Sequence, residues 1–408
     1  MSDGHAAEER HDERYQQRGV SAGKSEVHAA ISGVDAGLYP GAFCKIVPDL
    51  LTGSEEHALV IHADGAGTKS SLAYLAWKEG VGDQVWPGIA QDSLVMNLDD
   101  LACVGCLGPF LISNTIGRNA KLIPGPIIAG IVNGYQALCD KLTGLGIPCI
   151  MTGGETADVG DLVRTLIVDS TITARLKRDD IIDAAEMTPG DVIVGFESTG
   201  TATWEVVKNA GMGSNGLTSA RHELLGADYR AKYPETYAPE VPADLVYCGK
   251  FKFNDPLPGD PHFTVGEAIL SPTRTYLPLI RELLAAIPRR VGIPSQMCPG
   301  GLATGPSLFR RRGHWKGLHV WWVPNVTYVP PLFAALKEAT GQSWAECYSV
   351  YNMGWRLEAI LPAAHAQTAI DVAAKLGVHA QIVGRVESTG TDAREVIVKT
   401  PDGDVTYR

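Results

Sequence analysis

The chain has 408 residues, of which 45% are hydrophobic and 20% are charged, an ordinary composition for a soluble globular protein. A formal net charge of −11 and the absence of a long basic run argue against a nucleic-acid binder. No apolar stretch reaches membrane-spanning length, and the polar N-terminus has no signal-peptide core. We therefore expect a cytoplasmic protein, and the length favours two domains.

The first half of the chain alternates predicted strands and helices. Apolar and β-branched runs predict strands at 57–63, 109–116, 147–155 and 162–176, and helical spacing predicts helices at 68–78, 91–105 and 124–142. Asp92 is placed as the N-cap of the helix 91–105. Residues 1–14 look like a flexible leader, which leaves 15–180 as an N-terminal domain.

A C-terminal domain, 181–408, begins near the Pro-Gly-Asp turn at 189–191. Strand-like and helix-like segments mix in it without a strict βαβ rhythm, which favours a mixed α/β or α+β class. Residues 226–264 are rich in Pro, Tyr and Asp and lack periodicity, so we expect an insertion or a lid there.

The stretch DGAGTK indicates a site for nucleotide phosphates. Asp64 ends a predicted strand, and Gly65 and Gly67 permit a tight turn and the close approach of a ligand. Thr68 and Lys69 follow at a predicted helix N-terminus, where amides and a lysine attract phosphate and a nearby carboxylate suits Mg²⁺. The spacing is not that of a Walker loop. An ordinary strand–turn–helix connection explains the stretch equally well.

Three acidic residues, Asp92, Asp99 and Asp100, lie on the predicted helix 91–105. Asp92 and Asp99 are seven residues apart, about two helical turns, so both project to one side. Carboxylates on a largely apolar helix are costly to bury without cations, and metal binding explains that cost. The alternative is that Asp92 is a plain N-cap and that the other two face solvent.

The stretch TGGETAD, 152–158, is a third candidate site. A predicted strand ends at Gly153 and Gly154, and the amides of such a turn can form an anion nest. Glu155 and Thr156 follow, and Glu155 can coordinate a metal or orient a substrate amine. The alternative is a plain turn with a solvated Glu155.

The stretch GMGSNGLTSARHEL, 211–224, is the fourth. Glycine-rich backbone, Ser214 and Asn215 lead directly into a predicted helix, which is an anion-binding arrangement. The alternative is an ordinary helix cap made by Ser214 or Asn215, with Gly216 permitting the turn.

Together these stretches resemble aminoimidazole ribonucleotide synthetase, the phosphoribosylformylglycinamidine cyclo-ligase family. Six motifs occur in the family's order: HADGAGTKSSLA, AQDSLVMNLDDLACVG, TGGETAD, GSNGLTSARHEL, LSPTRTYLPLI and YNMGWRLEAI. The resemblance extends from about residue 15 to 388. DG-x-GTK with GGETA is typical of a wider ATP-dependent superfamily, whereas SNG, PTR-x-Y and NMG point to this branch.

The resemblance implies an enzyme that uses ATP and Mg²⁺ to close the imidazole ring in purine biosynthesis. ATP would activate the formyl amide oxygen of formylglycinamidine ribonucleotide, a substrate nitrogen would attack, and phosphate would leave. The protein would mainly position groups and stabilise charge. The family fold pairs two α/β domains and joins the N-terminal strands of two subunits in a barrel, which implies a homodimer.

The resemblance also implies roles for individual residues. The expected catalytic residues are Lys69, Asp100 and Glu155. The expected ATP-binding residues are Asp64, Gly65, Gly67, Thr68, Lys69, Asp92, Gly153, Gly154 and Thr156, with Asp64 and Asp92 as the metal carboxylates. The expected substrate-binding residues are Ser214, Asn215 and Arg274.

The chain departs from the family pattern mainly in the substrate-facing half. The family usually has Asn at Asp99 and His at Gly213 and at Gln296. His222 or His262 could take the place of a missing histidine. The resemblance therefore implies ATP use more directly than it implies the acceptor.

Two alternatives stay open. A related ATP-dependent phosphotransferase, such as thiamine-monophosphate kinase or selenophosphate synthetase, would share the ATP motifs, but the reactive N-terminal Cys of the latter is not evident. A non-catalytic, nucleotide-binding regulatory relative would account for the missing histidines. The intact acidic motifs and Lys69 argue against that relative.

Overall fold

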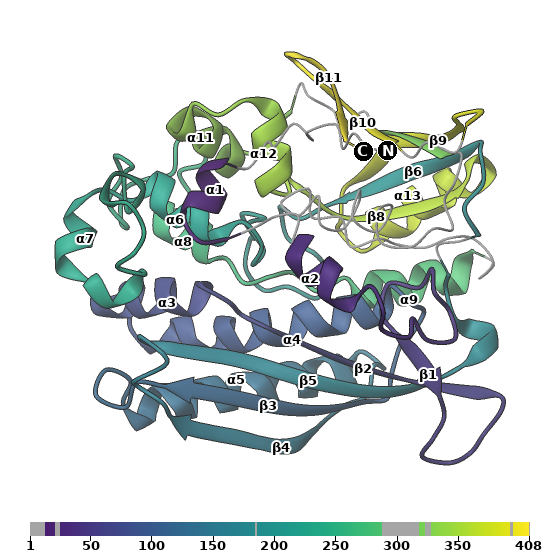
Figure 1. The fold of residues 1–408 in the computed structure, drawn as a ribbon, viewed down its shortest axis with the longest axis horizontal. Helices are drawn as coiled ribbons and strands as arrows, with labels where there is room; N and C mark the ends of the chain where they lie inside the picture. Colours follow the sequence, from purple (N-terminus) through teal and green to yellow (C-terminus); the bar gives the residue numbers. More distant parts are fainter. Residues whose placement is uncertain are drawn as a thin grey trace, which may run out of the picture.

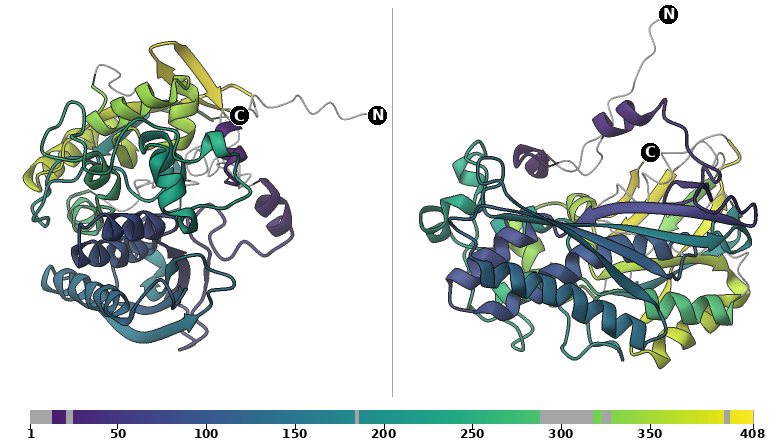
Figure 2. Two further views of the ribbon diagram at one scale, coloured as in Figure 1. Left: turned by 90° about the vertical axis from the view of Figure 1, so that its left-hand side faces the viewer. Right: turned by 90° about the horizontal axis from the view of Figure 1, so that it is seen from below.

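The computed structural model describes residues 13–20, 25–183, 186–287, 318–322, 328–391 and 395–407. It is a mixed α/β structure with two sheets, as expected. Figures 1 and 2 show the first sheet at one end of the molecule and the second at the other, with α3 (Lys69–Lys78) and α4 (Trp86–Ala102) between them. Among the described residues, no helix is long and apolar enough to cross a bilayer.

The first sheet has the strand order β1-β2-β5-β3-β4. Its strands are β1 (Ile46–Pro48), β2 (His57–Gly65), β3 (Phe110–Arg118), β4 (Cys149–Asp158) and β5 (Leu166–Lys177). Neighbouring strands are antiparallel except β3 and β4, which are parallel and are joined through α5 (Gly125–Gly144). Burial alternates along β5, so one face packs on the helices and the other is open.

The second sheet has the order β11-β10-β7-β9-β6-β8 and is likewise mixed. Its strands are β6 (Asp191–Glu197), β7 (Leu318–Trp322), β8 (Trp355–Pro362), β9 (Ala380–Ser388), β10 (Glu395–Thr400) and β11 (Gly403–Tyr407). The helices of this half are α6 (Leu217–Leu224), α7 (Asp228–Lys232), α8 (Val265–Leu270), α9 (Leu277–Ala286), α11 (Pro331–Thr340), α12 (Trp344–Val350) and α13 (Ala366–Lys375).

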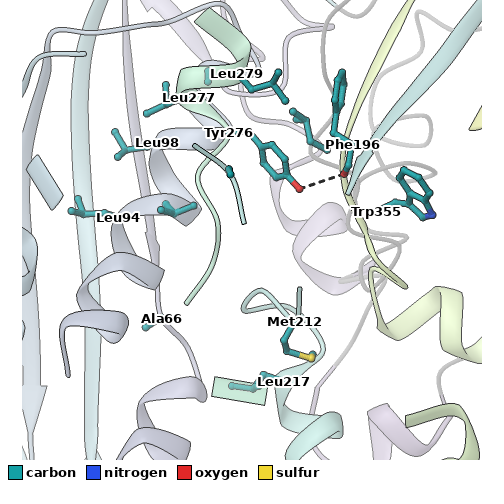
Figure 3. Close-up of a cluster of buried hydrophobic side chains, with 14 of the residues drawn as sticks. Ala66, Leu94, Leu98, Phe196, Met212, Leu217, Tyr276, Leu277, Leu279 and Trp355 are labelled. Atoms are coloured by element: carbon teal, nitrogen blue, oxygen red, sulfur yellow. Dashed lines mark hydrogen bonds between the residues drawn. The ribbon is translucent and has the colours of Figure 1, made fainter. Parts of the chain in front are cut away.

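One hydrophobic core joins the two halves. Leu94 and Leu98 of α4 belong to the same buried cluster as Phe196 and Trp355 of the second sheet. Figure 3 shows Tyr276 between them, with its hydroxyl donating to the carbonyl of Phe196 at 3.3 Å. The two sheets therefore share one core, because α4 contributes buried side chains to the cluster that also contains residues of the second sheet.

Helix α4 begins earlier than the sequence predicts. It starts at Trp86 with Pro87 in its first turn, a position that proline favours. Asp92 therefore lies in the middle of the helix and is fully buried, so its predicted role as an N-cap is wrong.

The segments at 13–14 and 226–264 contact other parts of the protein. Glu13–Gln17 form the short helix α1, and Arg14 pairs with Glu223 at 3.0 Å, so residues 13 and 14 are anchored. Residues 226–264 pack around the fully buried Tyr247, and Glu235 of this segment accepts a hydrogen bond from Tyr74 of α3 at 2.7 Å. The segment thus braces α3 and has its own packed interior.

Strand β4 continues through the glycines that the sequence predicts as a turn. The register of β3 and β4 shifts at Asn114, and Gly154 pairs with that residue. A Cβ on Gly154 would lie 1.8 Å from Asn114 Oδ1 and 2.3 Å from its backbone oxygen. The glycine is therefore required by the close approach of two strands at a bulge.

We expect Gly154→Ala to lower the free energy of unfolding by about 1–3 kcal/mol, the usual cost of forcing an added methyl group against neighbouring atoms. Gly144→Ala is the matched control, because nothing lies within 4 Å of its Cβ and it ends a helix. Denaturant unfolding of both variants checks this, and equal stabilities would contradict the close approach.

Candidate functional site

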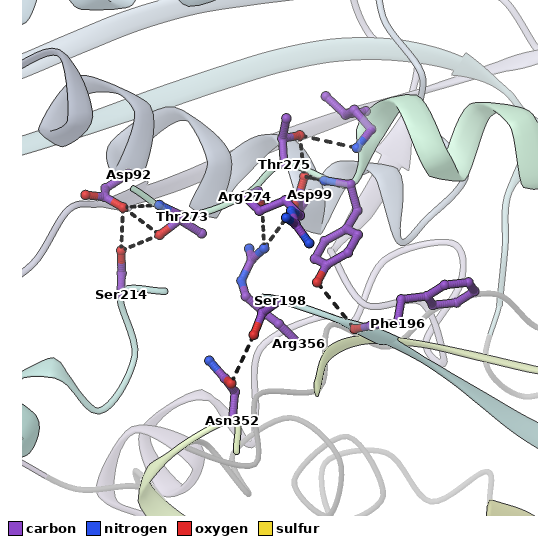
Figure 4. A network of polar contacts seen from close by, with 12 residues as sticks. Asp92, Asp99, Phe196, Ser198, Ser214, Thr273, Arg274, Thr275, Asn352 and Arg356 are labelled. Carbon is purple, nitrogen blue, oxygen red and sulfur yellow. Dashed lines mark hydrogen bonds and ion pairs between the residues drawn. The ribbon is translucent and has the colours of Figure 1, made fainter. Parts of the chain in front are cut away.

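Asp92 and Asp99 face residues 272–276 across the boundary between the two halves, as Figure 4 shows. Both carboxylates are fully buried. Their seven-residue spacing does put them on one side of α4, as predicted. Asp92 Oδ1 accepts from the backbone N–H of Thr273 at 2.7 Å and from its hydroxyl at 2.6 Å. We call this boundary the seam.

Lys69 lies inside the seam instead of beside an open ligand site. It begins α3 and is fully buried, and its ammonium donates to Asp92 Oδ1 at 2.8 Å. The backbone oxygens of Gly213 and Ser271 take hydrogen bonds at 3.2 and 2.5 Å. All three of its N–H donors are thereby used, and burial lowers its pKa. In this arrangement Lys69 has no donor left for ATP phosphates.

Asp99 makes the second contact of the seam. Its Oδ1 accepts from the hydroxyl of Thr275 at 2.8 Å and from the N–H of Tyr276 at 3.0 Å. Arg356 of β8 donates to Oδ2 at 3.1 Å. Burial raises the pKa of Asp99, and the Arg356 charge opposes that shift. The burial cost that suggested a metal is met at Asp99 by donors of the chain itself, so that part of the metal hypothesis is wrong.

Arg274 also points into the protein, although the resemblance implied a substrate contact. Its Nε and one Nη2 proton bind the carboxylate of Glu205, at 2.9 and 2.6 Å. The carbonyls of Glu197, Thr199 and Gly200 accept the remaining three N–H groups. All five guanidinium donors are therefore occupied, and Arg274 fixes the loop after β6.

A second polar group lies on the other side of α4, at the end of β2. Asp100 is one residue beyond Asp99, about 100° around the helix, and faces His62 with Oδ2 3.4 Å from Nε2. Burial, together with the negative charges of Asp64 and Asp99, raises the pKa of Asp100 well above its usual range. Burial and Asp64 also raise the pKa of Asp169 on β5. We call Asp64, Asp100 and Asp169 the acidic group.

The predicted residues on β4 lie in register with the end of β2. Gly65 pairs with Asp169, Asp169 with Thr115, and Thr115 with Glu155. Three strand spacings place Glu155 about 14 Å from Gly65 across the sheet. Gly153, Gly154, Glu155 and Thr156 are all exposed on this edge strand. The sheet thus places Glu155 of β4 in register with Gly65 at the end of β2, but the two residues are not in contact.

The loop before α6 approaches the predicted phosphate loop. Thr218 of α6 shares a 2.8 Å hydrogen bond with Thr68. Ser214 lies at the rim of the seam, with its hydroxyl 3.0 Å from that of Thr273. Neither Ser214 nor Asn215 caps α6, whose N-cap is Gly216 in the left-handed conformation. No described residue hydrogen-bonds the side chain of half-buried Asn215, so its amide is available.

The two histidines considered as replacements lie elsewhere. His222 is buried against Tyr247, and its Nδ1 accepts from the Tyr247 N–H at 3.2 Å. Burial and neighbouring Arg221 lower the pKa of His222 well below its usual range. His262 is exposed, and Gln296 lies outside the described residues.

The sequence analysis missed His62, Asn97, Asp169 and Arg356. His62 and Asp64 had a usable signal, because residues two apart on a strand share a face. Asp169 and Arg356 gave none, since Asp64 and Asp99, the acids that act on them, lie more than 100 positions away along the chain. Among the described residues, no three His, Cys, Asp or Glu side chains form a ready-made metal cage.

The chain is similar to a known family over most of its length. Residues 35–176 match the family model described as AIR synthase related protein, N-terminal domain. A phosphoribosylformylglycinamidine cyclo-ligase of Symbiobacterium thermophilum is 26% identical over 354 residues, 84% of each chain. A protein of the same name from Methanocaldococcus jannaschii is 26% identical over 84% of this chain and 83% of its own.

Solved structures share the fold at low identity. A chain of the HypE–HypF complex aligns with a TM-score of 0.56 and 14% identity over 93% of this chain and 97% of its own. AaThiL, complexed with AMPPCP and TMP, aligns with a TM-score of 0.51 and 12% identity over 95% and 97%. These alignments support the two-sheet architecture.

We expect Arg356→Met to lower the free energy of unfolding by about 3–5 kcal/mol, because Asp99 would remain as an unpaired buried charge. Asp99→Asn in the same chain should recover part of that loss. Denaturant unfolding in a double-mutant cycle measures the coupling, and additivity within about 0.5 kcal/mol would contradict it. Lys250→Met, which breaks an exposed pair with Glu338, is the control and should cost less than about 1 kcal/mol.

Proposed function

The chain is a divergent relative of the phosphoribosylformylglycinamidine cyclo-ligases, and we propose that it closes formylglycinamidine ribonucleotide to aminoimidazole ribonucleotide with ATP. The observation that carries this proposal is the extent of the similarity, which covers 84% of both chains. A match of that extent cannot be confined to either half of the chain, and the loop at 64–69 lies within the matched family model, residues 35–176.

The proposed chemistry suits a protein that positions and stabilises charge. A formyl amide oxygen is a poor leaving group until the terminal phosphoryl group of ATP is transferred to it. The amine nitrogen of the same substrate then bonds to the formyl carbon, the carbon–oxygen bond breaks, and phosphate leaves with that oxygen. The products are the aminoimidazole, ADP, phosphate and one proton. Holding nitrogen and carbon close together removes most of the entropic barrier to ring closure.

The loop 64–69 has features that suit phosphate binding. Gly67 has φ +57°, a conformation that glycine adopts without strain. Within the described structure, the backbone N–H groups of Gly67 and Thr68 have no acceptor, and both residues are exposed at the N-terminus of α3. Free amides at a helix N-terminus favour phosphate oxygens. In this proposal these amides take the role that the resemblance implied for Lys69.

The acidic group fits a divalent cation. Asp64 is exposed, and its charge raises the pKa of Asp100 and of Asp169, a repulsion that a cation would relieve. Mg²⁺ often takes only one or two protein carboxylates when phosphate and water complete its shell. We assign this role to Asp64, since Lys69 already neutralises Asp92. Bound there, Mg²⁺ would offset the charge of the ATP phosphates.

The substrate side of the proposal rests on Asn215. Its free amide lies three residues before Thr218, whose hydroxyl contacts Thr68 of the phosphate loop. An amide can donate to and accept from a polar substrate. The hydroxyl of Ser214 already hydrogen-bonds Asp92 in the seam, and all donors of Arg274 hydrogen-bond the loop after β6.

A second candidate is an ATP-dependent phosphotransferase with another acceptor. It is favoured by the extent of the family-model match, which covers residues 35–176 and thus the phosphate loop and the acidic group. The occupied guanidinium of Arg274 is a further point in its favour. A nucleotide-binding regulator without turnover is the third alternative.

We also propose that the protein is a homodimer through the open face of the first sheet. Ile61, Leu111 and Ile150 project from three strands in one row with Thr173. These three apolar side chains are 46–59% exposed, and Ile167 on the same face is 40% exposed. A contiguous apolar surface of this kind marks an interaction site. A second copy packed on this face would form the barrel that the resemblance implies.

We expect Leu111→Glu to convert a dimer to a monomer, because it places a charge in the centre of the apolar face. Val206→Glu is the matched control, since Val206 is 91% exposed in a loop of the C-terminal half. Sedimentation velocity of both variants and of the parent protein checks the prediction. A parent monomer, or a Leu111→Glu dimer, would exclude this face as the interface.

We expect Asp64→Asn to lower Mg-ATP-dependent turnover by about 10²-fold or more while the fold is kept, because it removes charge stabilisation at the phosphates. Asp140→Asn, on the exposed surface of α5, is the control. ADP release is measured with and without formylglycinamidine ribonucleotide, together with the aminoimidazole product. Substrate-dependent ADP matched by product supports ring closure, whereas ATP turnover without product would favour another acceptor.

A further inference from the structure

Two short sequence periods bring four polar side chains together beside the phosphate loop. His62 and Asp64 are two residues apart on β2 and share a face of the strand. Asn97 and Asp100 are three residues apart on α4 and share a face of the helix. The two faces meet, so that Asn97 contacts both His62 and Asp64, and Asp100 faces His62.

The partners of Asn97 fix the orientation of its amide. Its Nδ2 donates to the backbone oxygens of Asp64, Ser93 and Ser170, at 3.1, 3.2 and 3.0 Å. Carbonyls only accept, so the atom facing them is the nitrogen and the other is the oxygen. Asn97 is fully buried, which makes each of these contacts costly to lose.

The orientation of Asn97 in turn determines which nitrogen of His62 carries a proton. His62 Nδ1 lies 2.9 Å from Asn97 Oδ1, which can only accept. Nδ1 therefore carries a proton, and Nε2 faces Asp100 Oδ2, 3.4 Å away. The imidazole is held at both ends, by a buried amide on one side and a buried carboxyl on the other.

The surroundings of Asp100 show why such a partner matters. Asp100 is 6% exposed and feels the negative charges of Asp64 and Asp99, whereas the charge of Arg356 favours its ionised form. A contact with a polar neighbour restricts the rotation of a carboxyl in such a setting. Among the described side chains, His62 makes the ion-pair contact that joins Asp100 to the strand carrying Asp64.

We propose that His62 is a positioning residue that holds the Asp100 carboxyl beside the phosphate loop and is itself oriented by Asn97. The expected effect on kcat rests on the proposed function, whereas the position of His62 rests on its contacts with Asn97 and Asp100. His62 does not touch the reacting atoms in this proposal and acts through Asp100.

Two conservative substitutions separate the contacts of His62. The amide of Gln reaches approximately where Nε2 stood, so His62→Gln keeps a polar group toward Asp100 that can donate or accept. The amide of Asn reaches approximately where Nδ1 stood, so His62→Asn keeps only the contact with Asn97. The exposed His379 of the C-terminal half provides the control His379→Gln.

Steady-state kinetics of the full-length protein tests the proposal. We expect His62→Asn to lower kcat by about tenfold, the effect of losing one polar contact, with the KM for ATP unchanged. His62→Gln should stay within about threefold of the parent. A purely structural role predicts the reverse order and equal losses of thermal stability and activity. That reverse order, or unchanged kcat in both variants, would overturn the proposal.

Nitrogen NMR of the imidazole tests the geometry without any activity. In the parent protein, His62 should show a protonated Nδ1, and Asp100→Asn should shift the Nε2 signal while Nδ1 stays protonated. An unprotonated Nδ1, or an Nε2 signal that ignores Asp100, would refute the arrangement. A parent without ring closure but with the expected spectra would contradict the proposed function and leave the positioning geometry supported.

Discussion

The buried carboxylate of Asp92 is the constraint on which the arrangement of the two halves depends. A carboxylate removed from water needs donors, and those of Asp92 come from α3 through Lys69 and from residue 273 of the C-terminal half. Asp99 repeats the requirement two helical turns further along. The donors at residues 273, 275 and 276 therefore match the spacing of the acids, and a slip of the segment by one residue would take these donors away from both carboxylates.

The same helix carries both the seam and the acidic group. Asp99 and Asp100 are neighbours in sequence but face different surroundings, because successive residues of a helix diverge by about 100°. Arg356 binds Asp99, and its charge also acts on Asp100. A shift of the C-terminal half would therefore be felt at the carboxyl beside the phosphate loop. Arg356 thus links the seam electrostatically to the acidic group.

The sequence predicted most of the individual helices and strands, but it did not predict which residues they contact. Alternating apolar residues predicted β2, β3 and β5, and helical spacing predicted α3 and α5 to within a few residues. It failed where one residue type has two common roles. Asp92 was predicted as an N-cap, a common position for Asp, but the helix already begins at Trp86, with Pro87 well placed in its first turn. Gly153 and Gly154 were predicted as a turn, but a β-bulge also uses glycine, because glycine has no Cβ to clash with a neighbouring strand.

The sequence predicted which acidic residues belong to the candidate site, but not which residues pair with them. The seven-residue spacing correctly put Asp92 and Asp99 on one face, yet nothing local indicated that Thr273 and Arg356 would meet them. Those partners lie 181 and 257 residues away along the chain. A periodic sequence pattern carries no information about pairing between residues far apart along the chain. For Asp99 this pairing supplies the positive charge, from Arg356, that the sequence analysis had attributed to a metal.

Charge balance separates the two polar regions of the molecule and explains what each can bind. In the seam, two cations, Lys69 and Arg356, face two carboxylates, so the region is neutral and offers little to a charged ligand. The acidic group has three carboxylates and His62 as its nearest basic side chain. Phosphates approaching the free amides of Gly67 and Thr68 would be repelled by this group unless a cation came with them. The nucleotide with a divalent cation that the proposed function requires would satisfy both the amides and the acids, and neither a bare anion nor a bare cation would do so.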